Sequence, residues 1–169
     1  MKKSIFILSF LLIQTTGYSQ QQTPESYYSR GCTRDRIGMH DEAILDFTKV
    51  IGFTPKDAKV WNARGLAYYH KKEYESALSD FNQAIKLDSK MDVAWFNKGV
   101  LLLDTKKYDD ALTCFNEAIK LNGTNSTYYS KRGLAKYQKN DTTGACVDFK
   151  KAVELGDADS QKDVDQYCK

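Results

Sequence analysis

Few side chains in this sequence have the types and spacing that catalysis needs. His40 and His70 are the only histidines, and no serine, histidine and acidic residue stand in a context that supports nucleophilic catalysis. The recurring glycines are single and far apart, so they do not form a loop that could hold a phosphate group. We interpret His40 as a polar turn residue and His70 as a polar residue at a helix end. The sequence therefore predicts no enzyme, no cofactor and no metal site.

The cysteines are the other reactive groups, and they are Cys32, Cys114, Cys146 and Cys168. No pair has the C-x-x-C spacing of a metal or redox site. Cys146 and Cys168 lie 11 residues on either side of Asp157, in an expected turn between helices, so an antiparallel pairing makes them neighbours. An oxidising compartment would allow a disulfide there. The alternative is two small buried apolar residues; Cys32 and Cys114 are expected to stay unpaired.

The first 19 residues have the layout of a secretory signal peptide. The basic pair Lys2–Lys3 precedes the apolar run Ile5–Ile13, and Gly17 and Ser19 form a small-x-small pattern. The run is too short to span a bilayer. We predict that residues 1–19 are removed by cleavage after Ser19 and that the protein is exported by a bacterium, to the periplasm or the medium. The alternatives are a buried N-terminal helix and a membrane anchor.

Cleavage would leave about 150 residues, which suits one domain with a sizeable core. The formal charge would fall from +3 to +1, because both removed charges are lysines. A nearly neutral chain gives no reason to expect nucleic acid or an anionic membrane as a partner. No later segment is apolar enough to cross a membrane, so we expect no membrane insertion after cleavage.

A period of 34 residues runs from Pro24 to Asp159 and is the strongest signal in the chain. Three columns repeat one residue type each: Gly31, Gly65, Gly99 and Gly133; Ala43, Ala77, Ala111 and Ala145; Phe47, Phe81, Phe115 and Phe149. Such a period marks stacked repeats, in which each unit buries its apolar face on its neighbour. We expect glycine and alanine to let two helices approach closely, and phenylalanine to fill the space between units.

Each frame contains two apolar patterns of helical spacing, separated by turn residues. In the second frame Trp61, Gly65 and Tyr68 share one stripe, and Ala77 and Phe81 begin the next. This motif, an aromatic residue before glycine followed by Ala-x-x-x-Phe and a breaker, resembles the tetratricopeptide repeat family. The resemblance covers residues 24–159 and is specific for the fold, but it is weak evidence for a function.

The predicted fold is all-α, a right-handed α-solenoid of four helix-turn-helix units with a C-terminal capping helix. The units are residues 24–57, 58–91, 92–125 and 126–159, with a short disordered lead at 20–23 and the capping helix at 160–169.

Basic residues precede the glycines, and a partner column follows 16 residues later. The pairs are Arg30 and Asp46, Arg64 and Asp80, Lys98 and Cys114, and Arg132 and Asp148. Across an antiparallel hairpin the two members lie side by side, which predicts an Arg–Asp bridge in units one, two and four. Each would contribute at most about 1 kcal/mol if exposed. The alternative is a row of arginines that face a ligand.

In a superhelix of helix hairpins the first helices line the concave face. The predicted groove consists of Tyr28, Asn62, Leu66, Tyr69, Phe96, Val100, Leu103, Ser130, Leu134 and Tyr137. Apolar and aromatic groove residues suit a partner peptide or protein segment. The alternative for Leu66, Val100 and Leu134 is packing between units. The lysine–asparagine set with which some family members hold a terminal carboxylate is missing. A different function, a self-associating structural scaffold of the cell envelope, also fits a repeat array whose first unit has no cap.

Overall fold

The structure is a computed structural model that describes residues 23–168. The predicted signal peptide, positions 20–22 of the predicted lead, and Lys169 lie outside the described residues. Residues 23–168 form nine α-helices and no strand. The helices are α1 (Pro24–Arg36), α2 (His40–Phe53), α3 (Ala58–His70), α4 (Tyr74–Leu87), α5 (Asp92–Asp104), α6 (Tyr108–Leu121), α7 (Ser126–Gln138), α8 (Thr142–Glu154) and α9 (Ser160–Tyr167).

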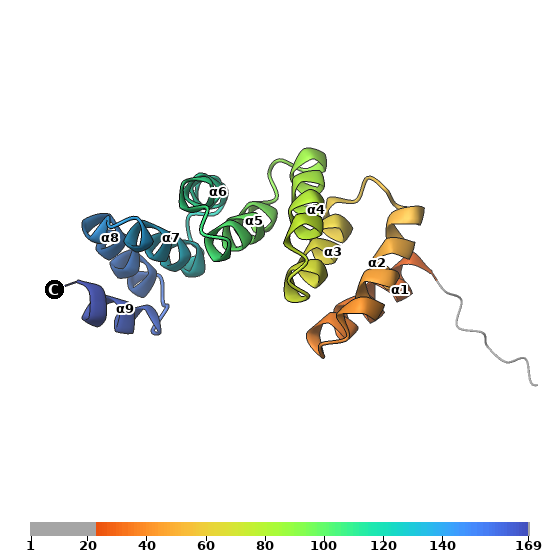
Figure 1. Cartoon of the computed structure of the whole chain (residues 1–169), viewed down its shortest axis with the longest axis horizontal. Helices are drawn as coiled ribbons and strands as arrows, with labels where there is room; N and C mark the ends of the chain where they lie inside the picture. Colours follow the sequence, from red (N-terminus) through yellow and green to blue (C-terminus); the bar gives the residue numbers. More distant parts are fainter. Residues whose placement is uncertain (1–22, 169) are drawn as a thin grey trace, which may run out of the picture.

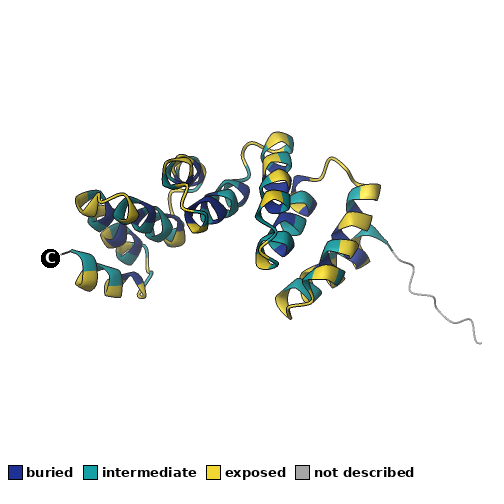
Figure 2. Cartoon of the chain, in the orientation of Figure 1, coloured by how far each residue is buried: buried dark blue, intermediate teal, exposed yellow. Residues whose placement is uncertain are grey.

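The helices form a single row of antiparallel hairpins. α1 packs on α2, α3 on α4, α5 on α6 and α7 on α8, and each second helix also packs on the first helix of the next unit. The row is elongated, with α1 and α9 at opposite ends (Figure 1). Buried residues lie where neighbouring helices meet (Figure 2). The predicted all-α repeat solenoid is therefore confirmed. Within the described part no helix is both long and apolar enough to cross a bilayer.

Side-chain caps and one repeated turn set the helix boundaries. Thr23, which we predicted to lie in a disordered lead, is the N-cap of α1 and accepts a hydrogen bond from the Ser26 backbone N–H at 3.2 Å. The turn inside each unit has one residue with positive φ at the same offset, beginning with Gly38 at +86°. Its equivalents are Lys72, Lys106 and Asn140. The same left-handed turn therefore closes the hairpin in every unit.

The glycine column makes room for the phenylalanine of the same unit. A Cβ added to Gly99 would lie 2.7 Å from Phe115 Cε1, and one added to Gly65 would lie 2.8 Å from Phe81 Cε1. Gly31 and Gly133 stand equally close to their own phenylalanines. All four rings are at most 1 % exposed. Each ring therefore lies on the glycine of its own hairpin, and Phe81 also shares a core cluster with Leu101 and Leu102 of the next unit, as expected of a residue that fills the space between units.

Arginine–aspartate pairs, each with a buried carboxylate, join the two helices of three units. The pairs are Arg30–Asp46, Arg64–Asp80 and Arg132–Asp148, each with two hydrogen bonds of 2.7 to 2.9 Å. The predicted bridges are present in units one, two and four. The aspartate side chains are only 2 to 5 % exposed, so each carboxylate depends on its arginine for hydrogen bonds that water does not supply.

The first and last units add a second cation to the buried carboxylate. Arg34 lies 2.6 Å from Asp46, and Lys136 lies 2.8 Å from Asp148. Burial by itself would raise the pKa of Asp46, but the hydrogen bonds and charges of Arg30 and Arg34 outweigh it and the pKa is lowered. Asp46 therefore stays ionised in the folded chain at neutral pH.

Unit three replaces both members of the pair together. Cys114 is 3 % exposed, and burial raises the pKa of its thiol to about 11. A neutral thiol needs no arginine. Lys98 keeps the contact with an aromatic ring that the arginines of the other units also make, at 5.8 Å from the ring centre of Trp95.

Two glycine substitutions test the contact between Gly99 and Phe115. Gly99→Ala should lower the free energy of unfolding by about 1 to 3 kcal/mol, because the added methyl group overlaps a ring that cannot move away. Gly52→Ala is the matched control in α2, where an added Cβ meets nothing within 4 Å. It should raise stability by up to about 1 kcal/mol through helix propensity. Urea unfolding followed by circular dichroism measures both, and equal effects of the two substitutions would contradict the contact.

Candidate functional site on the concave face

The first helices of neighbouring units lie in contact, α1 with α3, α3 with α5 and α5 with α7. Most of the predicted groove residues on these first helices have half-buried side chains. They are Tyr28, Leu66, Tyr69, Phe96, Val100, Ser130, Leu134 and Tyr137. Three of them, Leu66, Val100 and Leu134, also pack against the core. Part of each of these side chains therefore serves packing, which was the alternative to partner binding.

Two predicted groove residues are buried and are not open to a partner. Asn62 is 6 % exposed, and its Oδ1 accepts a hydrogen bond from Asn97 Nδ2 at 3.0 Å, which joins α3 to α5. Leu103 is 8 % exposed and belongs to the central core. The prediction that these two side chains face a partner was wrong, because the offset of a residue gives its helix face but not how closely the next unit covers it.

The remaining aromatic residues are held in place by their neighbours. Phe96 stacks on Tyr128 with ring centres 4.7 Å apart. The Tyr69 hydroxyl donates to Asp104 at 2.5 Å. Burial and this hydrogen bond raise the pKa of Tyr69, so the hydroxyl remains a donor at neutral pH. Fixed, half-exposed aromatic rings offer contact area with little loss of side-chain entropy on binding.

Helix α9 covers the far end of the predicted groove. The ring centres of Tyr137 and Tyr167 are 4.2 Å apart, and Tyr167 also lies 5.8 Å from Phe149. Tyr137 therefore packs against α9, which leaves less of its ring open to a partner. Sequence reasoning did not find this contact, because Tyr167 lies beyond the repeated region.

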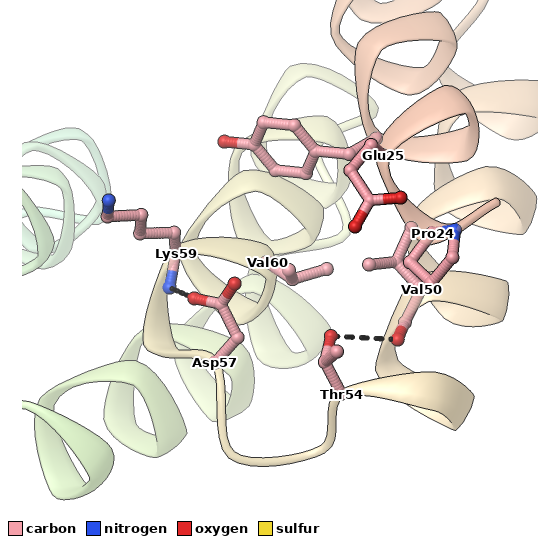
Figure 3. Close-up of a pocket in the computed structure, with 8 residues that line it drawn as sticks. Pro24, Glu25, Val50, Thr54, Asp57, Lys59 and Val60 are labelled. Carbon is pink, nitrogen blue, oxygen red and sulfur yellow. Dashed lines mark hydrogen bonds between the residues drawn. The ribbon is translucent and has the colours of Figure 1, made fainter.

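A pocket of about 230 Å³ opens beside Tyr28 at the other end of the face. The start of α1, the end of α2 and the start of α3 enclose it (Figure 3). Val50 and Val60 give it an apolar wall, and Glu25, Asp57 and Lys59 give it charged edges. This volume is below the range of about 300 to 1,000 Å³ typical of small-molecule sites, so it fits one side chain of a partner better than a cofactor.

The two histidines come together on one carboxylate. His40 Nδ1 lies 2.7 Å and His70 Nδ1 lies 3.0 Å from Asp35 Oδ1. Treating both histidines as separate polar residues missed this cluster. Repeat geometry holds the signal that could have found it, because residues 35 apart also meet in Asn62–Asn97 and Tyr69–Asp104.

Comparison with known proteins agrees with the geometry. Sequence profiles described as Tetratricopeptide repeat match residues 24–57, 58–91 and 93–125. The chain belongs to the tetratricopeptide repeat family. A search of curated protein sequences finds no match.

Solved structures resemble this tetratricopeptide repeat chain over most of its length. A crystal structure of MamA has a TM-score of 0.74 at 23 % identity, covering 83 % of this chain and 82 % of that one. TTC0263, a thermophilic TPR protein in Thermus thermophilus, has a TM-score of 0.77 at 18 % identity, covering 87 % and 82 %. The first TPR of Spaghetti (RPAP3), bound to the HSP90 peptide SRMEEVD, has a TM-score of 0.64 at 22 % identity, covering 66 % and 90 %. Identities this low support the fold alone.

Proposed function

We propose that this protein is an exported, non-enzymatic interaction module that holds a partner peptide or protein segment along its concave face. The observation that carries the proposal is the row of fixed, half-exposed aromatic side chains on α1, α3 and α5, which ends in the pocket beside Tyr28. A segment that crosses Phe96 and Tyr69 would place an apolar side chain in that pocket. The usable groove is shorter than predicted, since α9 covers Tyr137.

One structural relative was solved with a bound HSP90 peptide, so a fold of this kind can hold a peptide. The present chain lacks the lysines and asparagines expected for a clamp on a peptide's terminal carboxylate. Asn62, the one asparagine in the predicted groove, is bonded to Asn97. We therefore expect recognition of internal aromatic or aliphatic side chains in an extended segment.

The proposal includes export and a disulfide between Cys146 and Cys168. Their Cα atoms are 5.5 Å apart, within the range that a disulfide requires. The bridge would link α8 to the end of α9 and close a loop of 22 residues, which stabilises the fold by about 3 kcal/mol in the chain-entropy account. It would hold α9 over Tyr137.

Truncation of the aromatic groove residues tests the interaction module. Peptides selected from a displayed random library on the full chain should bind Tyr69→Ala and Phe96→Ala at least about 10-fold more weakly, because each loses an anchor of roughly 1 to 3 kcal/mol. Fluorescence anisotropy with one selected peptide measures the dissociation constants.

Val147→Ala is the control, because Val147 is a 63 % exposed apolar residue on α8, outside the predicted groove and the lining of the pocket beside Tyr28. This control variant should bind the selected peptide with the same affinity as the wild-type chain. Thermal melts show which variants fold. If the folded Tyr69→Ala/Phe96→Ala double variant still binds the peptide with wild-type affinity, the partner binds elsewhere.

The intact mass of the protein recovered from an exporting bacterium tests export and the disulfide together. The chain should begin at Gln20. Alkylation in denaturant without reductant should modify two cysteines, Cys32 and Cys114, and alkylation after reduction should modify all four. Cys168→Ser should add Cys146 to the unreduced set. Four modified cysteines in the unreduced wild-type chain would contradict the disulfide, and retained residues 1–19 would contradict cleavage.

A second candidate function, self-association, is favoured by one observation. Four of the six exposed large apolar residues in the described part belong to unit one: Ile37, Met39, Leu45 and Phe53. Since the first unit has no neighbour on its outer side among residues 23–168, these side chains could join two copies.

Sedimentation over a range of concentrations tests this second function. If unit one joins two copies, the wild-type chain should shift towards a dimer as concentration rises, and Leu45→Glu/Phe53→Glu should remain a monomer. Lys49→Glu serves as a control for charge, since it places one acid on the same helix without removing an apolar side chain. A wild-type chain that stays monomeric at every concentration would contradict self-association and leave the groove as the functional surface.

A further inference from the structure

Asp35, His40 and His70 form a compact three-residue group, named here the Asp35 cluster. Both histidines direct Nδ1 at the same carboxylate, at 2.7 Å for His40 and at 3.0 and 3.1 Å for His70. Their rings are 5.2 Å apart. The chain contains only two histidines, separated by 30 residues, and the fold places both on one acidic side chain.

Three helix ends position the cluster. Asp35 lies in the last turn of α1, His40 begins α2, and His70 is the last residue of α3. The left-handed turn at Gly38 returns the chain so that His40 faces Asp35. Stacking of unit two on unit one brings His70 to the same carboxylate. The backbone that presents these side chains is therefore fixed by helix ends and by the unit interface.

The three side chains offer two imidazole nitrogens and a carboxylate oxygen, and these ligand atoms lie within 4.8 Å of one another. In a tetrahedral zinc site with bonds of about 2.0 to 2.1 Å, ligand atoms are roughly 3.3 Å apart. Side-chain rotation within the cluster would therefore suffice to surround an ion. Imidazole suits zinc, copper and nickel, whereas magnesium and calcium prefer oxygen ligands alone.

Charge and access also suit a cation. Among residues 23–168 no lysine or arginine forms an ion pair with Asp35. The nearby Lys71 is paired with Asp41 at 2.5 Å and with Glu73 at 2.6 Å. An open hollow reaches the cluster, lined by Asp35, Arg36, Gly38, His40 and His70, so an ion and its remaining water ligands have a path from solvent. Arg36 is the one cation in this lining, and its side chain is exposed.

The cluster is specific to the first two units. One repeat further along, the equivalent residues are Tyr69, Tyr74 and Asp104, where a tyrosine hydroxyl donates to the carboxylate. In that arrangement Asp104 is the one side chain that binds metal ions strongly. Repeat packing alone therefore does not require two histidines and an aspartate at this position.

We propose that Asp35, His40 and His70 bind a divalent transition-metal ion, with Zn²⁺ as the reference ion and water completing its coordination. The bound ion would join α1, α2 and α3 and so cross-link unit one to unit two. Such a site goes beyond the proposed groove function and does not depend on it. Metal binding would stabilise the end of the solenoid that carries the exposed apolar residues and the pocket beside Tyr28.

Titration of Zn²⁺ into the full chain, purified without a polyhistidine tag, tests the proposal by calorimetry. Cys32→Ser is the background for every variant, because Cys32 is an exposed thiol one turn before Asp35 and could capture zinc by itself. We expect one Zn²⁺ per chain, no heat from Mg²⁺ at the same concentration, and a higher melting temperature with zinc. Asp35→Asn, His40→Gln and His70→Gln should each weaken zinc binding at least about 10-fold.

Asp104→Asn is the matched control, since it removes an acidic side chain at the position equivalent to His70 in the next unit. Its zinc affinity should stay within about twofold of the background. Thermal melts without metal show which variants fold, and the zinc-dependent rise in melting temperature gives a second readout in those that do. The proposal is overturned if the background chain binds no stoichiometric zinc, or if all three cluster variants keep its affinity.

Discussion

The close contact between the glycine of a first helix and the phenylalanine ring of the second helix in the same unit sets the spacing on which the rest of the fold depends. With the ring against a backbone that has no side chain, the two helices approach closely, and the alanine column is fully buried between them. The same spacing in each unit lets the hairpins stack in a regular row. Only in such a row do α1, α3, α5 and α7 meet to form one continuous face.

Arginine–aspartate pairs with buried carboxylates add a directional interaction between the two helices to this apolar contact. A carboxylate that is almost fully buried is costly unless it is paired, so the hairpin with Asp80 is favourable only in the register that aligns it with Arg64. Unit three shows that the apolar contact suffices without the pair, because it keeps Gly99 on Phe115 while a neutral Cys114 replaces the aspartate. In units one, two and four the pairs therefore favour one register of a hairpin that the apolar contact can form without them.

Period and spacing predicted the helices, the units and the pairs between residues 16 apart, since these depend on backbone geometry that every unit repeats. They did not predict how deeply a groove residue is buried. Asn62 and Leu103 share offsets with half-exposed residues, but the neighbouring unit covers them. Nor did they predict the contact of Tyr167 with Tyr137, because α9 follows the last repeat and has no equivalent to guide the inference.

Contacts between residues 35 apart are where the units differ from one another. At the turn edge, the first interface places Asp35 against His70, and the second places Tyr69 against Asp104. The third has Leu103 at the equivalent position, and its side chain is buried in the core. The shared packing columns hold the backbone at this edge in one geometry, so its side chains vary without disturbing the stack. In this way a repeat protein can acquire a site that only one of its interfaces carries. His40 and His70, which meet on Asp35 at the first interface only, are the clearest example in this chain.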